Sequence, residues 1–167
     1  MRKTRAALAI AALATATLGT TTPAQARGDG WEKVPDRGAF TVRACGTALR
    51  LTEVVNREYQ RTTTTDADGT MHFQITGAYK VRVTAKDGRS ALINASGPGF
   101  PTLTEAGVYT FDARGLNIVY LNRMDRRALG LPALSVTSGP LTIRYKRGSV
   151  TLLRAPAHVR NVCDLLR

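Results

Sequence analysis

The chain contains few side chains of the kinds that nucleophilic attack, proton transfer or metal binding require. There are only two histidines, His72 and His158, and only two cysteines, Cys45 and Cys163. No H-x-x-x-H, C-x-x-C or G-x-S-x-G motif occurs, so spacing alone pairs neither histidine with a nucleophile or a second metal ligand. We therefore expect no bound metal and no cofactor, and the composition favours a protein that is not an enzyme.

The carboxylate of Glu53 is the one candidate for acid–base catalysis. Glu53 shares its parity with apolar residues of a strand predicted over 47–62, and Arg57 follows four residues later. If the strand alternates regularly, both side chains point inward, whereas a bulge at Val54–Val55 would return both to solvent. An inward Glu53 beside a tyrosine such as Tyr79 would suit a barrel-type isomerase or hydrolase. The alternative is that Glu53 pairs with Arg57 or faces the solvent.

Positive charge is the strongest chemical signal in the sequence. The formal net charge is +12, and cationic residues recur on the solvent-facing sides of the predicted hairpins. Such surfaces attract polyanions, whereas the aromatic residues that could stack on nucleic-acid bases lie mostly on apolar faces. We expect an anionic cell-envelope polymer rather than nucleic acid as the partner; the alternative is a charged surface that only aids solubility. The anion-binding candidates are Lys80, Arg82, Lys86, Arg144 and Lys146.

The stretch from Met71 to Lys86 predicts the element around which the fold is built. Its odd-numbered residues, such as Phe73 and Tyr79, are apolar, and its even-numbered residues are mostly polar, so one face belongs to a core. A straight strand of this length would span about 50 Å, which is too long for a small domain. We therefore expect a bend at Gly77, and a strongly curved sheet or a closed barrel.

The Asp87–Gly88 turn that follows leaves two strand registers open. As a two-residue hairpin loop it would pair Val81 with Asn94 and make the interior partly polar. The partly polar interior would form a cavity for a small apolar ligand, for which the binding candidates are Tyr79, Asn94 and Phe111. A slipped register would instead bury Ala91, Ile93 and Ala95.

The pattern along the whole chain predicts a mainly all-β protein. A short helix is expected near 123–129, where Asn122 can cap its start and Gly130 can end it. A second helix is expected at the C-terminus, from about Pro156. Together the elements indicate a single antiparallel meander β-barrel of about eight strands over residues 39–167.

The first 26 residues have the pattern of a secretory signal peptide. Three positive residues precede an uncharged run rich in Ala and Leu, and Ala24-Gln25-Ala26 supplies an A-x-A cleavage pattern. We expect cleavage after Ala26, the alternative being an uncleaved anchor, and an irregular arm over 27–38. The rest of the chain contains no apolar run long enough to cross a membrane, so the sequence predicts a secreted, extracellular monomer.

The two cysteines are expected to form one disulfide in an oxidising compartment. A Cys45–Cys163 bond would tie the first strand to the C-terminal segment and would stabilise the fold by roughly 4–5 kcal/mol in the chain-entropy model. The alternative, a catalytic or metal-binding thiol, has no partner residues in the sequence.

Three segments are similar to small secreted proteins of actinobacteria. They are F-T-V-R-A-C-G at Phe40–Gly46, N-A-S-G-P-G at Asn94–Gly99 and N-V-C-D-L-L at Asn161–Leu166. This resemblance implies export but brings no activity and no functional residues. The strand pattern resembles, in architecture only, the antiparallel barrels of lipocalin-type and dirigent-type proteins.

These patterns favour a secreted, non-catalytic binding protein. The ligand would be a small apolar molecule inside the barrel or an anionic envelope polymer on the basic surface. The alternatives are the barrel enzyme that uses Glu53 and a structural or inhibitory surface protein that acts through loops such as Gly97–Pro101.

Overall fold

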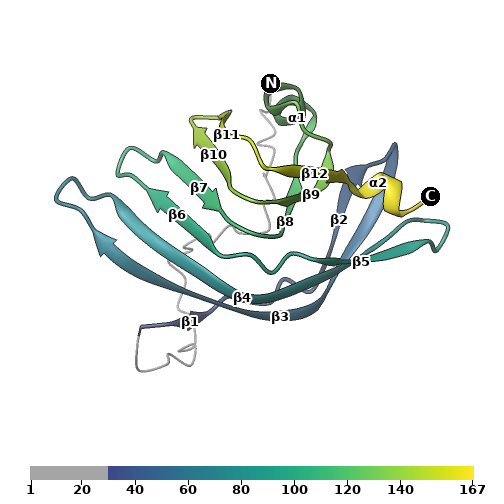
Figure 1. The fold of residues 1–167 in the computed structure, drawn as a ribbon, viewed down its shortest axis with the longest axis horizontal. Helices are drawn as coiled ribbons and strands as arrows, with labels where there is room; N and C mark the ends of the chain where they lie inside the picture. Colours follow the sequence, from purple (N-terminus) through teal and green to yellow (C-terminus); the bar gives the residue numbers. More distant parts are fainter. Residues whose placement is uncertain (1–29) are drawn as a thin grey trace, which may run out of the picture.

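The structure, a computed structural model, describes residues 30–167, and the predicted signal peptide lies outside these residues. The described chain is mainly β, with twelve strands and two short helices in which all strand pairs are antiparallel (Figure 1). The strands are β1 (Glu32–Lys33), β2 (Ala39–Ala44), β3 (Thr47–Thr65), β4 (Met71–Thr84), β5 (Ser90–Asn94), β6 (Gly99–Leu103), β7 (Tyr109–Ala113), β8 (Asn117–Tyr120), β9 (Leu134–Ser138), β10 (Leu141–Lys146), β11 (Ser149–Arg154) and β12 (His158–Asn161). The helices are α1 (Arg123–Leu129) and α2 (Val162–Leu165).

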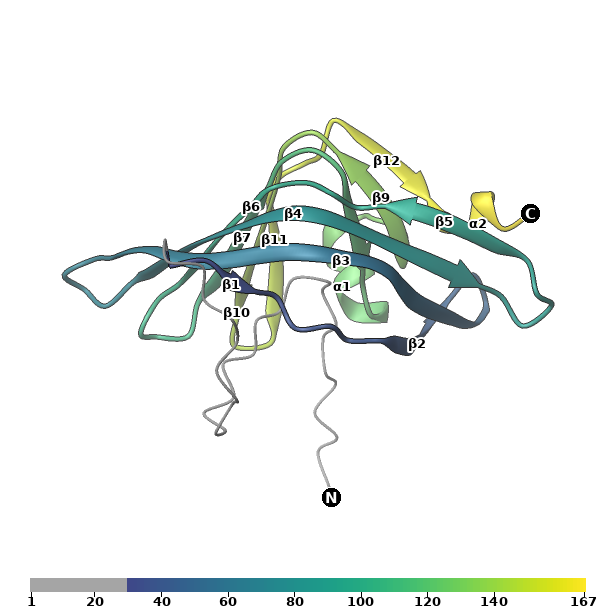
Figure 2. The same cartoon turned by 90° about the horizontal axis from the view of Figure 1, so that it is seen from below.

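The long hairpin of β3 and β4 organises the fold. Its ladder runs from Arg50 opposite Thr84 to Thr65 opposite Met71. At one end of the hairpin, β2 pairs with β3 and β5 pairs with β4; at the other end, β1 pairs with β3 and β6 pairs with β4. Figures 1 and 2 show the two strands running side by side, as one arch, along the length of the molecule.

Two local features let these strands curve. Gly77 has φ of 136°, and a Cβ atom there would overlap the backbone oxygen of Arg57. Only glycine adopts this conformation without strain and permits such a close backbone approach. The facing strand has a bulge between Glu53 and Val55. The bulge lies in β3, where the adjacent valines indicated one, whereas the pairing of β4 with β3 continues through Gly77 without a register shift.

The strands form two sheets, and barrel closure is not confirmed. The larger sheet has the order β1-β3-β4-β6-β7-β10-β11, with β2 and β5 at the far half of the hairpin, and the smaller has the order β12-β9-β8. Within residues 30–167 neither sheet closes on itself. The expected number of strands, about eight, was too low because short strands flank each half of the hairpin separately.

The smaller sheet divides the core into two clusters. On β8, Ile118 packs in the cluster that contains Leu49, Tyr79 and Val83, whereas the next residue, Val119, packs in the cluster around Phe111. Successive side chains of a strand point to opposite faces, so each face of β8 covers a different apolar cluster. The protein therefore has two filled cores on either side of a shared sheet.

The hairpin after β4 adopts the slipped register. Val81 pairs with Ile93, and Lys80 with Asn94. The loop has three residues rather than two, because Ala85 and Arg89 close it and Gly88, with φ of 88°, occupies its last position. Of the two registers that the sequence left open, the one that pairs Val81 with Asn94 is therefore wrong, and Asn94 lies exposed on the outer face.

One of the two helices has the bounds predicted from the sequence, and the other does not. Helix α1 has the predicted bounds, with the Asn122 side chain accepting from the first turn and Gly130 ending the helix at φ of 67°. Helix α2 is one turn long and begins at Val162. The expected start near Pro156 is wrong because residues 158–161 pair with β9 as strand β12.

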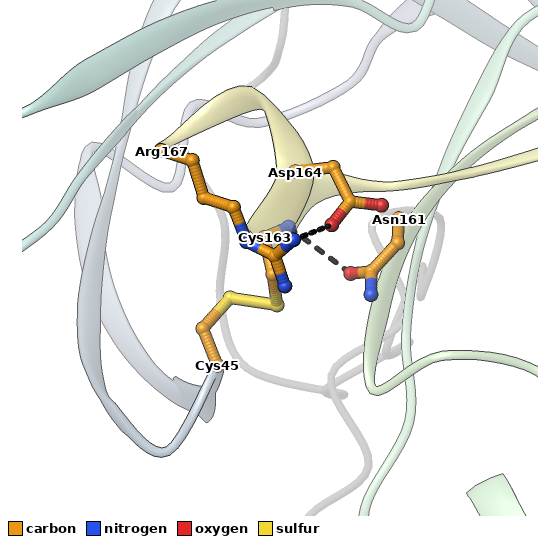
Figure 3. The surroundings of a disulfide bond; sticks show 5 residues. All are labelled: Cys45, Asn161, Cys163, Asp164 and Arg167. Atoms are coloured by element: carbon orange, nitrogen blue, oxygen red, sulfur yellow. Dashed lines mark hydrogen bonds and ion pairs between the residues drawn. A yellow bond between two sulfur atoms is a disulfide. The ribbon is translucent and has the colours of Figure 1, made fainter.

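Both chain ends of the domain are tied to the sheet. Cys45 and Cys163 form the predicted disulfide, with their Cα atoms 5.4 Å apart across 118 residues of sequence (Figure 3). The predicted irregular arm contains the short strand β1, and the guanidinium of Arg61 lies 4.5 Å from the ring centroid of Trp31. Trp31 thus anchors the arm to β3 through a cation–π contact.

Candidate functional site

The bulge in β3 places two carboxyl groups on the inner face of the hairpin. Glu53, before the bulge, lies opposite Val81, and Glu58, after it, lies opposite Gly77. These two glutamates are five residues apart and would point to opposite faces in a regular strand; the extra bulge residue brings them to one face. Arg57 points outward and is exposed. The sequence reasoning treated Glu53 and Arg57 as a pair and missed Glu58, although the bulge position implied this change of parity.

The carboxyl oxygens of Glu53 accept three hydrogen bonds. The Tyr79 hydroxyl donates to Oε1 at 2.9 Å, and the backbone N–H groups of Arg37 and Gly38 donate to Oε2 at 2.6 and 2.9 Å. Glu53 is half-buried rather than returned to solvent, which corrects the expectation for a bulged strand. The two backbone hydrogen bonds therefore attach the segment that joins β1 to β2 to strand β3 at its bulge.

Glu58 is the most perturbed acid of the described residues. Burial, reinforced by the negative charge of Glu53 and opposed by Arg37, raises the pKa of Glu58 to about 7. Glu58 also lines an enclosed cavity of about 20 Å³ together with Asn117. The Asn117 amide nitrogen is buried and has no hydrogen-bond partner among the described residues. A cavity of this size accommodates one water molecule, which could bridge the two side chains.

Tyr79 remains a proton donor in this site. Burial, the hydrogen bond to Glu53 and the nearby carboxylates all raise the pKa of its hydroxyl well above the ordinary value. We call Glu53, Glu58 and Tyr79 the carboxyl site. A carboxyl group with a pKa near neutrality beside an acceptor carboxylate is an arrangement suited to proton transfer.

The opposite face of the same hairpin carries exposed cations. Lys80 and Arg82 of β4 point outward as predicted. Arg43 of β2 and Arg50 of β3, which sequence reasoning missed, and Arg57 of β3 lie on the same face. Arg50 pairs with Thr84, so Arg82, two residues before Thr84, is its diagonal neighbour at roughly 7 Å. We call the five cations and the outward side of strands β2 to β5 the basic outer face.

This face contains no compensating acid. The outward positions of β2 to β5 hold only neutral or cationic side chains, and none of the ion pairs within residues 30–167 involves the five cations. Two exposed aliphatic side chains lie among them, Leu92 opposite Arg82 and Val54 at the bulge. The face is therefore a positively charged surface with small apolar patches.

The other predicted anion-binding residues lie elsewhere. Lys86 is in the β4–β5 turn, and Arg144 and Lys146 are exposed on β10, which β6 and β7 separate from β4 in the sheet order. Strand register explains why Arg43 and Arg50 join Lys80 and Arg82 while the cations of β10 do not. This register was not evident from the positions of the cations in the sequence.

The three candidates for an internal ligand do not form one pocket. Tyr79 belongs to the first apolar cluster and Phe111 to the second, whereas Asn94 is exposed on the basic outer face. The enclosed cavity that Phe111 lines has a volume of only about 20 Å³. It is far smaller than the ~300 Å³ at which ligand pockets begin.

No three acidic, histidine or cysteine side chains among residues 30–167 are placed to hold a metal ion. In the same residues no helix has the length and apolar character of a membrane span. No protein-family model matches the chain, and comparison with curated proteins and with solved structures found no match.

Proposed function

We propose that the protein is a secreted binding protein that holds an anionic polymer of the cell envelope on its basic outer face. The observation that carries this proposal is the group of five exposed cations on one sheet face without a carboxylate among them. The Cys45–Cys163 disulfide supports export, because thiols are kept reduced in most cytosols. The predicted barrel and its internal apolar ligand receive less support, since the core clusters are filled.

A sheet face suits an extended, charged chain. The cations project from neighbouring strands at roughly 7 Å intervals, which is within the ~8 Å screening length at physiological ionic strength. They therefore act together on a polyanion, and the released counterions make binding sensitive to salt. The exposed Leu92 and Val54 offer contacts for apolar parts of such a polymer.

The test is binding to a soluble polyphosphate and to a polycarboxylate at low and at physiological salt. We expect Arg50→Gln/Arg82→Gln to lower the affinity at least about tenfold and to flatten its salt dependence. The matched control is Arg144→Gln/Lys146→Gln, which removes the same charge from β10 and should change the affinity no more than about threefold. Equal losses in the two double variants would show only non-specific attraction and would contradict the proposal.

A second candidate function is acid–base catalysis at the carboxyl site. The pKa of Glu58 near 7, with the Glu53 carboxyl held by three donors, favours this candidate. The small volume of the adjoining cavity opposes it. Chromogenic glycosides and esters test it: hydrolysis lost in both Glu53→Gln and Glu58→Gln would support catalysis, and no turnover by the wild type would reject it for these substrates.

A further inference from the structure

A groove of about 630 Å³ lies beside the Cys45–Cys163 disulfide. One wall is the β4–β5 turn, the other is the C-terminal segment that carries α2, and the β2–β3 turn closes its end. The floor contains Leu49 and Leu166, which are 0% and 6% exposed, together with Ala85. The groove therefore has an apolar base at the rim of the first core cluster.

The disulfide holds the walls of this groove together. Cys45 and Gly46 form a two-residue turn in which both have positive φ, 54° and 74°, so the Cys45 side chain is presented at the tip of the β2–β3 hairpin. Its bond to Cys163 fixes α2 over the end of the sheet (Figure 3). The Asn161 side chain accepts from Cys163 N–H at 3.0 Å and holds the start of α2 in place.

Three cations and the Asp87 carboxylate surround the apolar floor. Lys86 and Arg89 lie on the turn wall, and Arg167 lies on the C-terminal wall. Arg89 is bound to Asp87 at 2.6 Å and Arg167 to Asp164 at 3.5 Å, but all four side chains are at least half exposed. Exposed ion pairs of this kind are weak and can exchange for a ligand anion. Lys86 takes part in none of the ion pairs within residues 30–167.

We propose that this groove is a binding site for a small amphipathic anion, with an apolar body and a carboxylate or phosphate head. The body would lie on Ala85 and Leu166, and the head would lie between Lys86 and Arg167 on the two walls. The volume is within the ~300–1,000 Å³ range of ligand pockets, and an apolar floor with few converging polar groups is their usual composition. The cations of this site, Lys86, Arg89 and Arg167, are not among the cations of the basic outer face.

Three naphthalene probes of similar size test the proposal. Naphthoate and naphthyl phosphate carry the two anionic heads, and naphthalenemethanol is neutral. Calorimetry or ligand-detected NMR with the full mature chain should show at least one anionic probe binding about tenfold more tightly than the neutral one. Preference for carboxylate or phosphate would identify the head group.

The variant Lys86→Ala/Arg167→Ala should remove this preference, lowering the affinity for the anionic probe about tenfold while leaving the neutral probe unchanged. The matched control is Arg144→Ala/Lys146→Ala, which removes the same charge from β10 and should leave probe binding unchanged. Equal binding of all three probes, no detectable binding, or the same loss in both variants would overturn the proposal. None of these outcomes depends on whether the polymer is bound.

Discussion

The two faces of the β3–β4 hairpin differ in the sign of their charged side chains and in how firmly the fold holds those side chains. On the outer face, the arginine and lysine side chains are exposed and make no ion pair within residues 30–167. On the inner face, Glu53 is fixed by three donors, and burial raises the pKa of Glu58 to about 7. Charges on the outer face add little to folding and are available to a partner, whereas those on the inner face are coupled to the fold. The same two strands thus carry the proposed binding surface on one face and charges that affect stability on the other.

Both faces depend on the close approach of β3 and β4 at Gly77. Substitution of Gly77 should therefore cause the largest loss of stability. Gly77→Ala places a Cβ atom against the backbone of Arg57 at φ of 136°, and we expect a loss of roughly 3 kcal/mol or more in the free energy of unfolding. Urea denaturation measures the loss. Gly88→Ala is the control: it also has positive φ but meets no atom within 4 Å, and should lose only about 1 kcal/mol. Similar losses in both would show that the close approach at Gly77 is not important.

The inner face should make stability depend on pH. The pKa of Glu58 is raised from 4.5 to about 7 in the folded protein, so between these values the folded state keeps a proton that the unfolded chain has released. This contribution to stability is complete below pH 4.5 and is lost as the pH rises through about 7, by up to about 3 kcal/mol. The groups around Glu58 are Glu53, which strengthens the shift, and Arg37, which opposes it.

Substitution of Glu58 isolates this dependence. Denaturant unfolding at several pH values between about 4 and 8 should show Glu58→Gln losing less stability than the wild type as the pH rises, because glutamine does not titrate. Glu32→Gln, which changes an exposed acid on β1, should follow the wild-type curve. If the Glu58→Gln and wild-type curves are parallel, Glu58 does not titrate in this window.

Much of the architecture followed from the sequence because it depends on local patterns. The alternation in β4, Gly77, the capping residues of α1 and the two cysteines each specify a feature within a few residues. Of the carboxyl site, Glu53 and Tyr79 were predicted but Glu58 was not. Glu58 points to the inner face only because of the bulge, and the position of the bulge depends on the pairing of β3 with β4. The basic outer face was likewise incomplete, since Arg43 and Arg50 join it through long-range register.

The sequence was least informative where one segment fits two local structures equally well. The end of the chain has helical spacing, yet residues 158–161 pair with β9, because the unpaired edge of that strand offers a ladder of backbone hydrogen bonds. The Asp87–Gly88 turn suits loops of two or three residues, and burial of Ile93 and Ala95 selects the longer one. Tertiary packing decided both cases.

The outer face should give the smallest change in stability. Arg50→Gln/Arg82→Gln removes two exposed side chains without an ion-pair partner in the described residues, so the free energy of unfolding should change by no more than about 0.5 kcal/mol. Relief of repulsion between diagonal neighbours would make any change stabilising, and added salt should then reduce it. Denaturation of the double variant at low and high salt measures both effects. A loss above about 1 kcal/mol would mean that these arginines hold the sheet together, and their charge could no longer be assigned to recognition alone.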